Sequence, residues 1–189
     1  MKGAGARNPR PQCRGRNFPK AMITNLEQLY FDQLRDLYSA ESQLIAALPD
    51  LTNSVTDADL KKSFQKHMGE TRTHRARLQD IFCRHGLNPG GEDCEAVRGL
   101  IREARRHSAR TRSGSVRDAV LIAATNRIEH YEIAGYGTAR AFAECLGYAD
   151  DADILGTTLE EESDADEAIT KIATGGIFGR GVNELAAAV

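Results

Sequence analysis

The sequence predicts an all-α protein, and three observations lead to this class. Apolar residues recur at spacings of three and four from residue 24 onward, which is the period of an amphipathic helix. Runs of alternating β-branched residues, which are typical of strands, are few. Glycine and proline gather at a small number of points and divide the chain into long segments. Because about 150 residues per domain is usual, we expect one domain from this chain of 189 residues.

The first long helix is expected to begin at Thr24 or Asn25, because either side chain can cap a helix. Pro49 lies inside its apolar pattern and should kink the helix or locally break its hydrogen bonds. The helix should nevertheless continue, because the stripe extends beyond the proline. The apolar members of this stripe are Leu34, Leu37, Leu44, Leu48, Leu51 and Val55.

The second helix is expected from Thr56, which forms a capping-box-like pair with Asp59, to about His85. Gly86 then provides the C-terminal stop. The connection 87–114 has proline and glycine at its ends and a helical composition in its middle, about 93–108. We therefore predict a long crossover that contains a short helix.

The third helix is expected from Ser115, its cap, to about Leu146. After a tight turn at Gly147, the fourth helix should run from about Ala149 to Ala173, where a pair of glycines follows. Two antiparallel helical hairpins joined by one long crossover form the ferritin-like type of four-helix bundle. We expect no fifth helix after it, which disfavours a mineral-storing shell.

The bundle is expected to occupy residues 23–175, between two segments of different composition. Residues 1–22 form a basic arm without apolar period, which we expect to be disordered. The tail 176–189 has no clear role. No apolar run approaches the roughly 18 residues that span a bilayer, so the sequence predicts no membrane segment.

The four cysteines contain no C-x-x-C pair, which disfavours a zinc ribbon or a rubredoxin-type iron site. Their scatter is typical of a reducing compartment, so we expect a cytoplasmic protein. A structural disulfide between Cys83 and Cys94, near the predicted loop, is the minority alternative.

Acidic residues occupy stripe positions where apolar residues belong and where an unpaired charge is costly. Two histidines, His67 and His74, share the stripe of the second helix with position 70 or 71. The inward acids are Glu41, Glu70, Glu129, Glu132, Glu162 and Asp166. Residues of an antiparallel hairpin lie level when they are equidistant from its turn. The pairs that centre on the two predicted turns are Glu41 with Glu70, Glu132 with Glu162, and Glu129 with Asp166.

Carboxylates gathered at one level of a dry core would repel one another and resist ionisation unless cations neutralise them. Carboxylate and imidazole ligands suit iron or manganese, and inward Glu and His from four helices build di-metal sites. We therefore predict two bound metal ions, iron first and manganese as the alternative. In the competing interpretation the acids pair with Arg35, Arg72 or Arg127, or reach solvent.

Four stretches are similar to the YciE/YciF group of bacterial ferritin-like stress proteins, which are relatives of rubrerythrin. They are LRDLYSAESQLIAALP, HMGETRTH, VRDAVLIAATNRIEHYEIAGYGT and LGTTLEEESDADE, within about residues 24–174. The resemblance implies a ferritin-like bundle, a homodimer, a di-metal site and a link to stress response.

The resemblance also implies ligand places on all four helices. Glu41 takes the place on the first, Glu70 on the second, Glu129 and Glu132 on the third, and Glu162 with Asp166 on the fourth. The usual E-x-x-H pair is missing, because Thr73 stands where the histidine would follow Glu70. His74, one position later, is the candidate replacement. His67 is a candidate for a ligand or for a hydrogen-bond donor to the ligands. Tyr38 and His130 are further candidates for hydrogen bonds to the ligands, and ordinary core packing is the alternative.

Three functions fit these expectations. The first is a redox enzyme of the di-iron oxidase or peroxidase type, which needs an external electron donor because the chain has no rubredoxin module. The second is a stress-induced protein that sequesters metal, or a purely structural dimer without catalysis. The third, binding of nucleic acid through the basic arm and the arginines of 98–112, is disfavoured because Glu103 interrupts that cluster.

Overall fold

The computed structural model describes residues 22–175 and 179–189, so the predicted basic arm lies almost entirely outside the described residues. All regular secondary structure in this part is helical, which confirms the predicted fold class. The helices are α1 (Leu26–Ser54), α2 (Ala58–Arg84), α3 (Glu95–Ser108), α4 (Ser115–Leu146), α5 (Ala149–Thr174) and α6 (Val182–Ala187). No helix in the described part is both long and apolar enough to span a bilayer.

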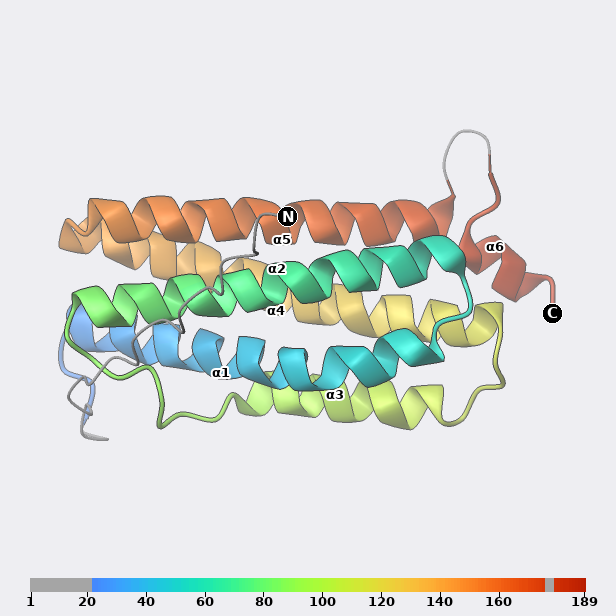
Figure 1. The fold of residues 1–189 in the computed structure, drawn as a ribbon, viewed down its shortest axis with the longest axis horizontal. Helices are drawn as coiled ribbons and strands as arrows, with labels where there is room; N and C mark the ends of the chain where they lie inside the picture. Colours follow the sequence, from blue (N-terminus) through green and yellow to red (C-terminus); the bar gives the residue numbers. More distant parts are fainter. Residues whose placement is uncertain (1–21, 176–178) are drawn as a thin grey trace, which may run out of the picture.

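The four long helices form the predicted bundle of two antiparallel hairpins (Figure 1). α1 pairs with α2, α4 pairs with α5, and the hairpins meet through contacts of α1 with α4 and of α2 with α5. The crossover contains the expected short helix, α3, which packs along α1 and α4 on the outside of the bundle. This arrangement brings one stripe from each long helix into a common interior.

The helix starts agree only in part with the predicted caps. Asn25 caps α1, because its side chain accepts a hydrogen bond of 2.9 Å from the backbone N–H of Gln28. α1 then continues through Pro49, as expected. The predicted cap of α2 was wrong: Asp57 accepts the N–H bonds of the first turn, and Thr56 bonds elsewhere.

The start of α4 also differs from the prediction. The cap position is Gly114, which makes no side-chain capping bond, and Ser115 is already the first helical residue. The glycine has a φ of 122°, a left-handed value that most other residues avoid. Backbone conformation therefore sets this boundary, and the prediction gave that role to the adjacent hydroxyl.

Glycines end α2 and α4 as the sequence predicts. Gly86 and Gly147 have φ values of 66° and 75°, in the left-handed region that favours glycine. After Gly147, the N–H of Tyr148 donates to the carbonyl of Ala143 at 2.9 Å, which is the bond of a Schellman motif. The tight turn between α4 and α5 follows from this geometry.

The expectation that no helix follows α5 was wrong. α6 is a helix of six residues that packs against α4 and α5. Its first residue, Val182, is buried in an apolar cluster with Leu51 and Ile122. The short segment VNELAA carried too few turns for helical periodicity to be detected.

The interior is divided into two apolar ends with a polar layer between them. One end is built around Tyr30, Phe31 and Leu155, and the other around Phe64 and Ile169. The inward carboxylates lie in the layer between these ends. A disulfide between Cys83 and Cys94 does not form, because Cys94 is a free, buried thiol.

Asp118 connects the first turn of α4 to the loop between α1 and α2. It is 1% exposed and accepts bonds from the N–H of Thr56 at 2.9 Å, the N–H of Asp57 at 2.8 Å and the Thr56 hydroxyl. Asp118→Ala is expected to lower the free energy of unfolding by about 2 kcal/mol, because buried donors lose their acceptor. Urea unfolding measures this, with exposed Asp153→Ala as the matched control. Equal stabilities of the two variants would contradict this role.

Candidate metal centre

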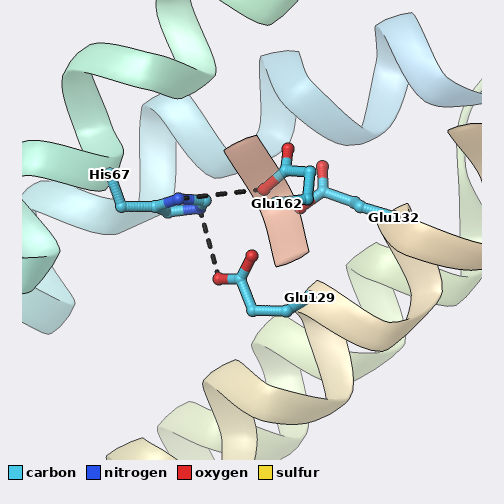
Figure 2. Close-up of side chains that lie close together, drawn as sticks. All are labelled: His67, Glu129, Glu132 and Glu162. Carbon is cyan, nitrogen blue, oxygen red and sulfur yellow. Dashed lines mark ion pairs between the residues drawn. The ribbon is translucent and has the colours of Figure 1, made fainter. Parts of the chain in front are cut away.

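Three helices bring one group of possible ligands together in the polar layer. His67 comes from α2, Glu129 and Glu132 from α4, and Glu162 from α5 (Figure 2). One ligand atom of each lies within 4.8 Å of the others. His67 Nε2 is 3.3 Å from Glu129 Oε1, and its Nδ1 is 3.9 Å from Glu162 Oε2. All four side chains are buried, so the group is held away from solvent.

A second group shares Glu162 with the first. It consists of Glu41 from α1, His74 from α2 and Glu162, again with ligand atoms within 4.8 Å of one another. His74 Nδ1 lies 2.8 Å from Glu162 Oε1 and 3.5 Å from Glu41 Oε1. Two adjacent groups joined by one carboxylate have the donor arrangement of a site for two metal ions.

The buried carboxylate oxygens of the centre have few hydrogen-bond partners. Apart from the contact of Glu162 Oε1 with His74 Nδ1, both oxygens of Glu129, Glu132 and Glu162, and Oε2 of Glu41, make no hydrogen bond within the described ranges. Leaving a buried charged oxygen without a partner is costly, and native structures rarely do so. The donor set of oxygens and imidazoles fits hard or borderline cations such as iron and manganese.

Burial makes several of these carboxyl groups hard to ionise in the metal-free protein. It raises the pKa of Glu41 to about 7, with repulsion from Glu162 adding to the increase and His74 opposing it. Burial also raises the pKa values of Glu129 and Glu132 well above their usual range, and neighbouring glutamates raise them further. Without a cation, the centre therefore holds protons at neutral pH.

The pKa values of the two histidines of the centre shift in opposite directions. Burial alone lowers the pKa of His74, but the adjoining carboxylates of Glu162 and Glu41 reverse this and raise it to about 10. For Glu162, the nearby imidazoles outweigh burial and hold its pKa below the usual range. For His67 the effect of burial is larger than that of the nearby carboxylates, so its pKa is lowered. His74 thus supplies the positive charge inside the metal-free centre.

Two of the predicted ligands lie outside the two groups. Glu70 is partly exposed and pairs with Lys66, with Nζ 2.6 Å from its Oε1. Asp166 is partly exposed, and its Oδ1 lies 3.7 Å from Nε2 of His130, whose side chain is 68% exposed. Tyr38 packs, partly buried, against the apolar end around Tyr30. The structure therefore gathers Glu41, His74, Glu129, Glu132 and Glu162, and adds His67 to them.

The competing interpretation, in which arginines neutralise the inward acids, does not describe these groups. Arg127 pairs with Glu103 at 3.5 Å, and Arg72 is exposed. The guanidinium of Arg35 lies 5.5 Å from the ring centre of Phe82. The carboxylates instead face the two buried histidines.

Sequence reasoning missed two residues that contact the centre. Tyr136 donates a hydrogen bond of 2.6 Å to Glu41 Oε1, and its stripe position could have indicated this. Glu161 contacts His74 from the outer side, with Oε2 2.8 Å from Nε2. Its signal was weaker, because three consecutive glutamates, 160–162, hide which of them turns toward the second helix.

Tyr136→Phe is expected to weaken Mn²⁺ binding by about 10-fold or more, as is usual when a ligand loses its outer hydrogen bond. Glu41 would lose a donor that stabilises its charged form, so protons should compete better with the metal. Mn²⁺ titrations at several pH values measure this. Equal affinities of the variant and the native protein across the pH range would contradict it.

The fold and the centre together define the class of protein: an all-helical, ferritin-like four-helix bundle whose polar layer of buried carboxylates and histidines is compatible with bound metal. The chain belongs to the family described as "Domain of unknown function (DUF892)", whose model matches residues 25–183. Protein YciF of Escherichia coli strain K12 is 38% identical over 163 residues, which cover 86% of this chain and 98% of that protein.

Solved structures show the same similarity. YcfI from Rhodopseudomonas palustris, named as a candidate structural protein, has a TM-score of 0.79 at 38% identity, covering 82% of this chain and 99% of that one. The E. coli stress protein YciF has a TM-score of 0.76 at 39% identity, covering 79% and 94%. A protein from Xanthomonas campestris pv. campestris shares the fold at 18% identity, with a TM-score of 0.61 and coverage of 78% and 89%.

Proposed function

We propose that this protein is a ferritin-like metalloprotein that binds two iron or manganese ions and acts in bacterial stress response through oxygen, peroxide or metal chemistry. One observation carries the proposal: buried carboxylate oxygens with few hydrogen-bond partners converge on two histidines in a single layer. Cations would neutralise this layer and use those oxygens as ligands.

Each residue of the centre has a distinct role in this proposal. Glu162 would help to hold both ions, because it belongs to both ligand groups. Glu41 and His74 would help to hold one ion, and His67, Glu129 and Glu132 would help to hold the other. Tyr136 holds Glu41 by its hydroxyl, and the apolar ends of the bundle keep water from the layer.

Two bound iron or manganese ions would supply reversible oxidation and reduction toward oxygen or peroxide. The residues of the chain would hold carboxylate charges and exchangeable protons close to the two ions. The raised pKa values of Glu129 and Glu132 let these carboxyls carry protons at neutral pH until a cation displaces them. Electrons would come from an external donor protein or from Fe²⁺ itself.

The name of the E. coli relative, a stress protein, supports a role in stress response. We also propose a cytoplasmic homodimer, from the resemblance of the sequence to its family. The R. palustris relative's name favours a second candidate function, a structural or metal-sequestering dimer without catalysis.

One experiment separates these functions. Protein loaded anaerobically with Fe²⁺ is mixed with hydrogen peroxide or oxygen, and Fe²⁺ oxidation is followed by ultraviolet absorbance. A redox protein should oxidise its iron at least about 100-fold faster than free Fe²⁺ in the same buffer, which corresponds to about 3 kcal/mol of barrier lowering. Bound iron that oxidises no faster than free iron would favour sequestration, and protein that binds neither Fe²⁺ nor Mn²⁺ would leave only the structural function.

A further inference from the structure

We propose that Glu161 is a positioning residue that holds the outer nitrogen of His74 and thereby aims its inner nitrogen at the metal centre. This inference rests on the proposed function, because the metal is what the inner nitrogen would bind. It concerns a residue at the rim of the bundle that belongs to neither ligand group.

His74 lies between two consecutive glutamates of α5. Its Nδ1 is 2.8 Å from Oε1 of Glu162, and its Nε2 is 2.8 Å from Oε2 of Glu161. Successive helical residues point about 100° apart, so neighbouring side chains can reach one ring from two sides. The Glu162 side chain is fully buried and the Glu161 side chain is 33% exposed, which places one inside the centre and the other at its edge.

Arg77 holds the Glu161 side chain in one orientation. The Arg77 guanidinium binds both of its oxygens, with Nη2 3.0 Å from Oε1 and Nη1 in contact with Oε2. Nη1 also donates to the Thr158 hydroxyl at 3.2 Å. A two-pronged arginine–carboxylate pair holds both partners in one geometry. The acceptor for the His74 ring is therefore already oriented in the metal-free protein.

The chemical consequence follows from the two nitrogens of imidazole. A metal binds a ring nitrogen that carries no proton, while the other nitrogen keeps its hydrogen. Metal-bound histidines almost always donate this second N–H to a carboxylate, a carbonyl or water, and the partner fixes the ring. With Glu161 accepting the Nε2–H, loss of the proton from Nδ1 would leave the Nδ1 lone pair facing Glu41 and Glu162.

His67 provides an internal contrast. Its two nitrogens face Glu129 and Glu162, which are both members of the centre. No ion pair joins this ring to a rim carboxylate in the part of the chain that the structure describes. The two histidines thus differ, and the geometry makes His74 the one whose orientation is set in advance.

The test uses Zn²⁺, a metal that leaves NMR signals sharp, and four proteins: native, Glu161→Ala, Glu161→Gln and Glu160→Ala. Glu160 is the matched control, because it is an exposed neighbour on the same helix. Zn²⁺ affinity is measured by competition with a coloured chelator. The His74 ring is observed by ¹H–¹⁵N correlation of the Zn²⁺-loaded protein.

Glu161→Ala should bind Zn²⁺ about 10- to 100-fold more weakly than the native protein, the usual cost of losing such a partner. Its His74 Nε2–H should exchange rapidly with water. Glu161→Gln keeps an oxygen that accepts this N–H and should restore most of the affinity, and Glu160→Ala should match the native protein. This rescue separates positioning from a general loss of folding.

Two results would overturn the inference, and they differ. If the native protein binds Zn²⁺ but Glu161→Ala matches Glu160→Ala in affinity and keeps Nδ1 ligation with a slowly exchanging Nε2–H, the positioning role fails alone. If native binding is absent, or survives Glu162→Ala unchanged, the proposed metal centre fails and the role of Glu161 fails with it.

Discussion

Glu162→Ala is expected to abolish stoichiometric Fe²⁺ binding, whereas the native protein binds about two ions per chain, as ferritin-like di-metal sites do. The reason is that Glu162 is the one member shared by both ligand groups. Its loss should lower the affinity for both ions by more than about 100-fold. A loss of about 100-fold is the upper range when a ligand loses only a hydrogen-bond partner, and Glu162 is itself a ligand. Anaerobic titration monitored by calorimetry measures the stoichiometry and the affinity.

Glu70→Ala and Asp166→Ala are the informative comparisons. Both residues are predicted ligands from the sequence, and both lie outside the two groups, at the partly exposed edge of the bundle. Each variant should keep two ions per chain with affinity within about 10-fold of native. If Glu70→Ala loses both ions as completely as Glu162→Ala, then α2 supplies Glu70 after all, and the arrangement of the metal-free centre is not that of the loaded one.

The metal-free protein is expected to be more stable at pH 6 than at pH 9, with a melting temperature higher by at least about 5 °C. Folding raises the pKa of His74 from 6.5 to about 10, so its stabilisation is complete below 6.5 and is lost as pH rises toward 10. Folding also raises the pKa of Glu41 from 4.5 to about 7, so ionisation destabilises the folded state as pH rises through that range. Both groups therefore lower the stability of the metal-free protein as pH rises.

Two groups set the acid limit of this trend. Glu162 has a lowered pKa, so its stabilisation is present above 4.5 and is lost as pH falls below that value. His67 also has a lowered pKa in the folded protein. Below pH 6.5 its imidazole binds a proton more readily in the unfolded chain than in the folded protein, so the free energy of unfolding falls. Stability of the metal-free protein should therefore fall again in acid.

Bound metal should reverse the trend between pH 5 and 7, because protons then compete for the ligands. Thermal melts of metal-free and Mn²⁺-loaded protein from pH 5 to 9 compare the two. Glu129→Gln combined with Glu132→Gln should flatten the metal-free profile, since two carboxyls with raised pKa values no longer titrate. Identical melting at every pH, with and without metal, would show that these carboxylates do not form a metal centre.

Much of the fold was predictable because the spacing of apolar residues within each segment indicates a helix without knowledge of distant contacts. The turn between α4 and α5 followed from Gly147, the end of α2 followed from Gly86, and the level of the centre followed from equal distances to the two hairpin turns. The cap of α2 was missed because Thr56 and Asp57 are both capping residues, and the choice depends on Asp118, 62 residues from Thr56. Local sequence does not contain that distant partner.

The centre was predictable in composition and less so in orientation. Glu41, Glu129, Glu132 and Glu162 sit in the stripes and are buried as expected. On α2, positions 70 and 71 both border the stripe, and the structure buries Thr71 and turns Glu70 toward Lys66. A rotation of the helix by a fraction of a turn decides this, and the rotation is set by packing against α1 and α5, which helical period alone does not specify.

The most direct test of the two-metal centre is anomalous X-ray scattering at the iron and manganese edges, from crystals of protein purified without chelator. Our account predicts two adjacent peaks, one among His67, Glu129, Glu132 and Glu162 and the other among Glu41, His74 and Glu162. The result that would contradict it is bound metal confined to the surface, or well-ordered crystals of metal-supplemented protein that show no anomalous peak in this layer.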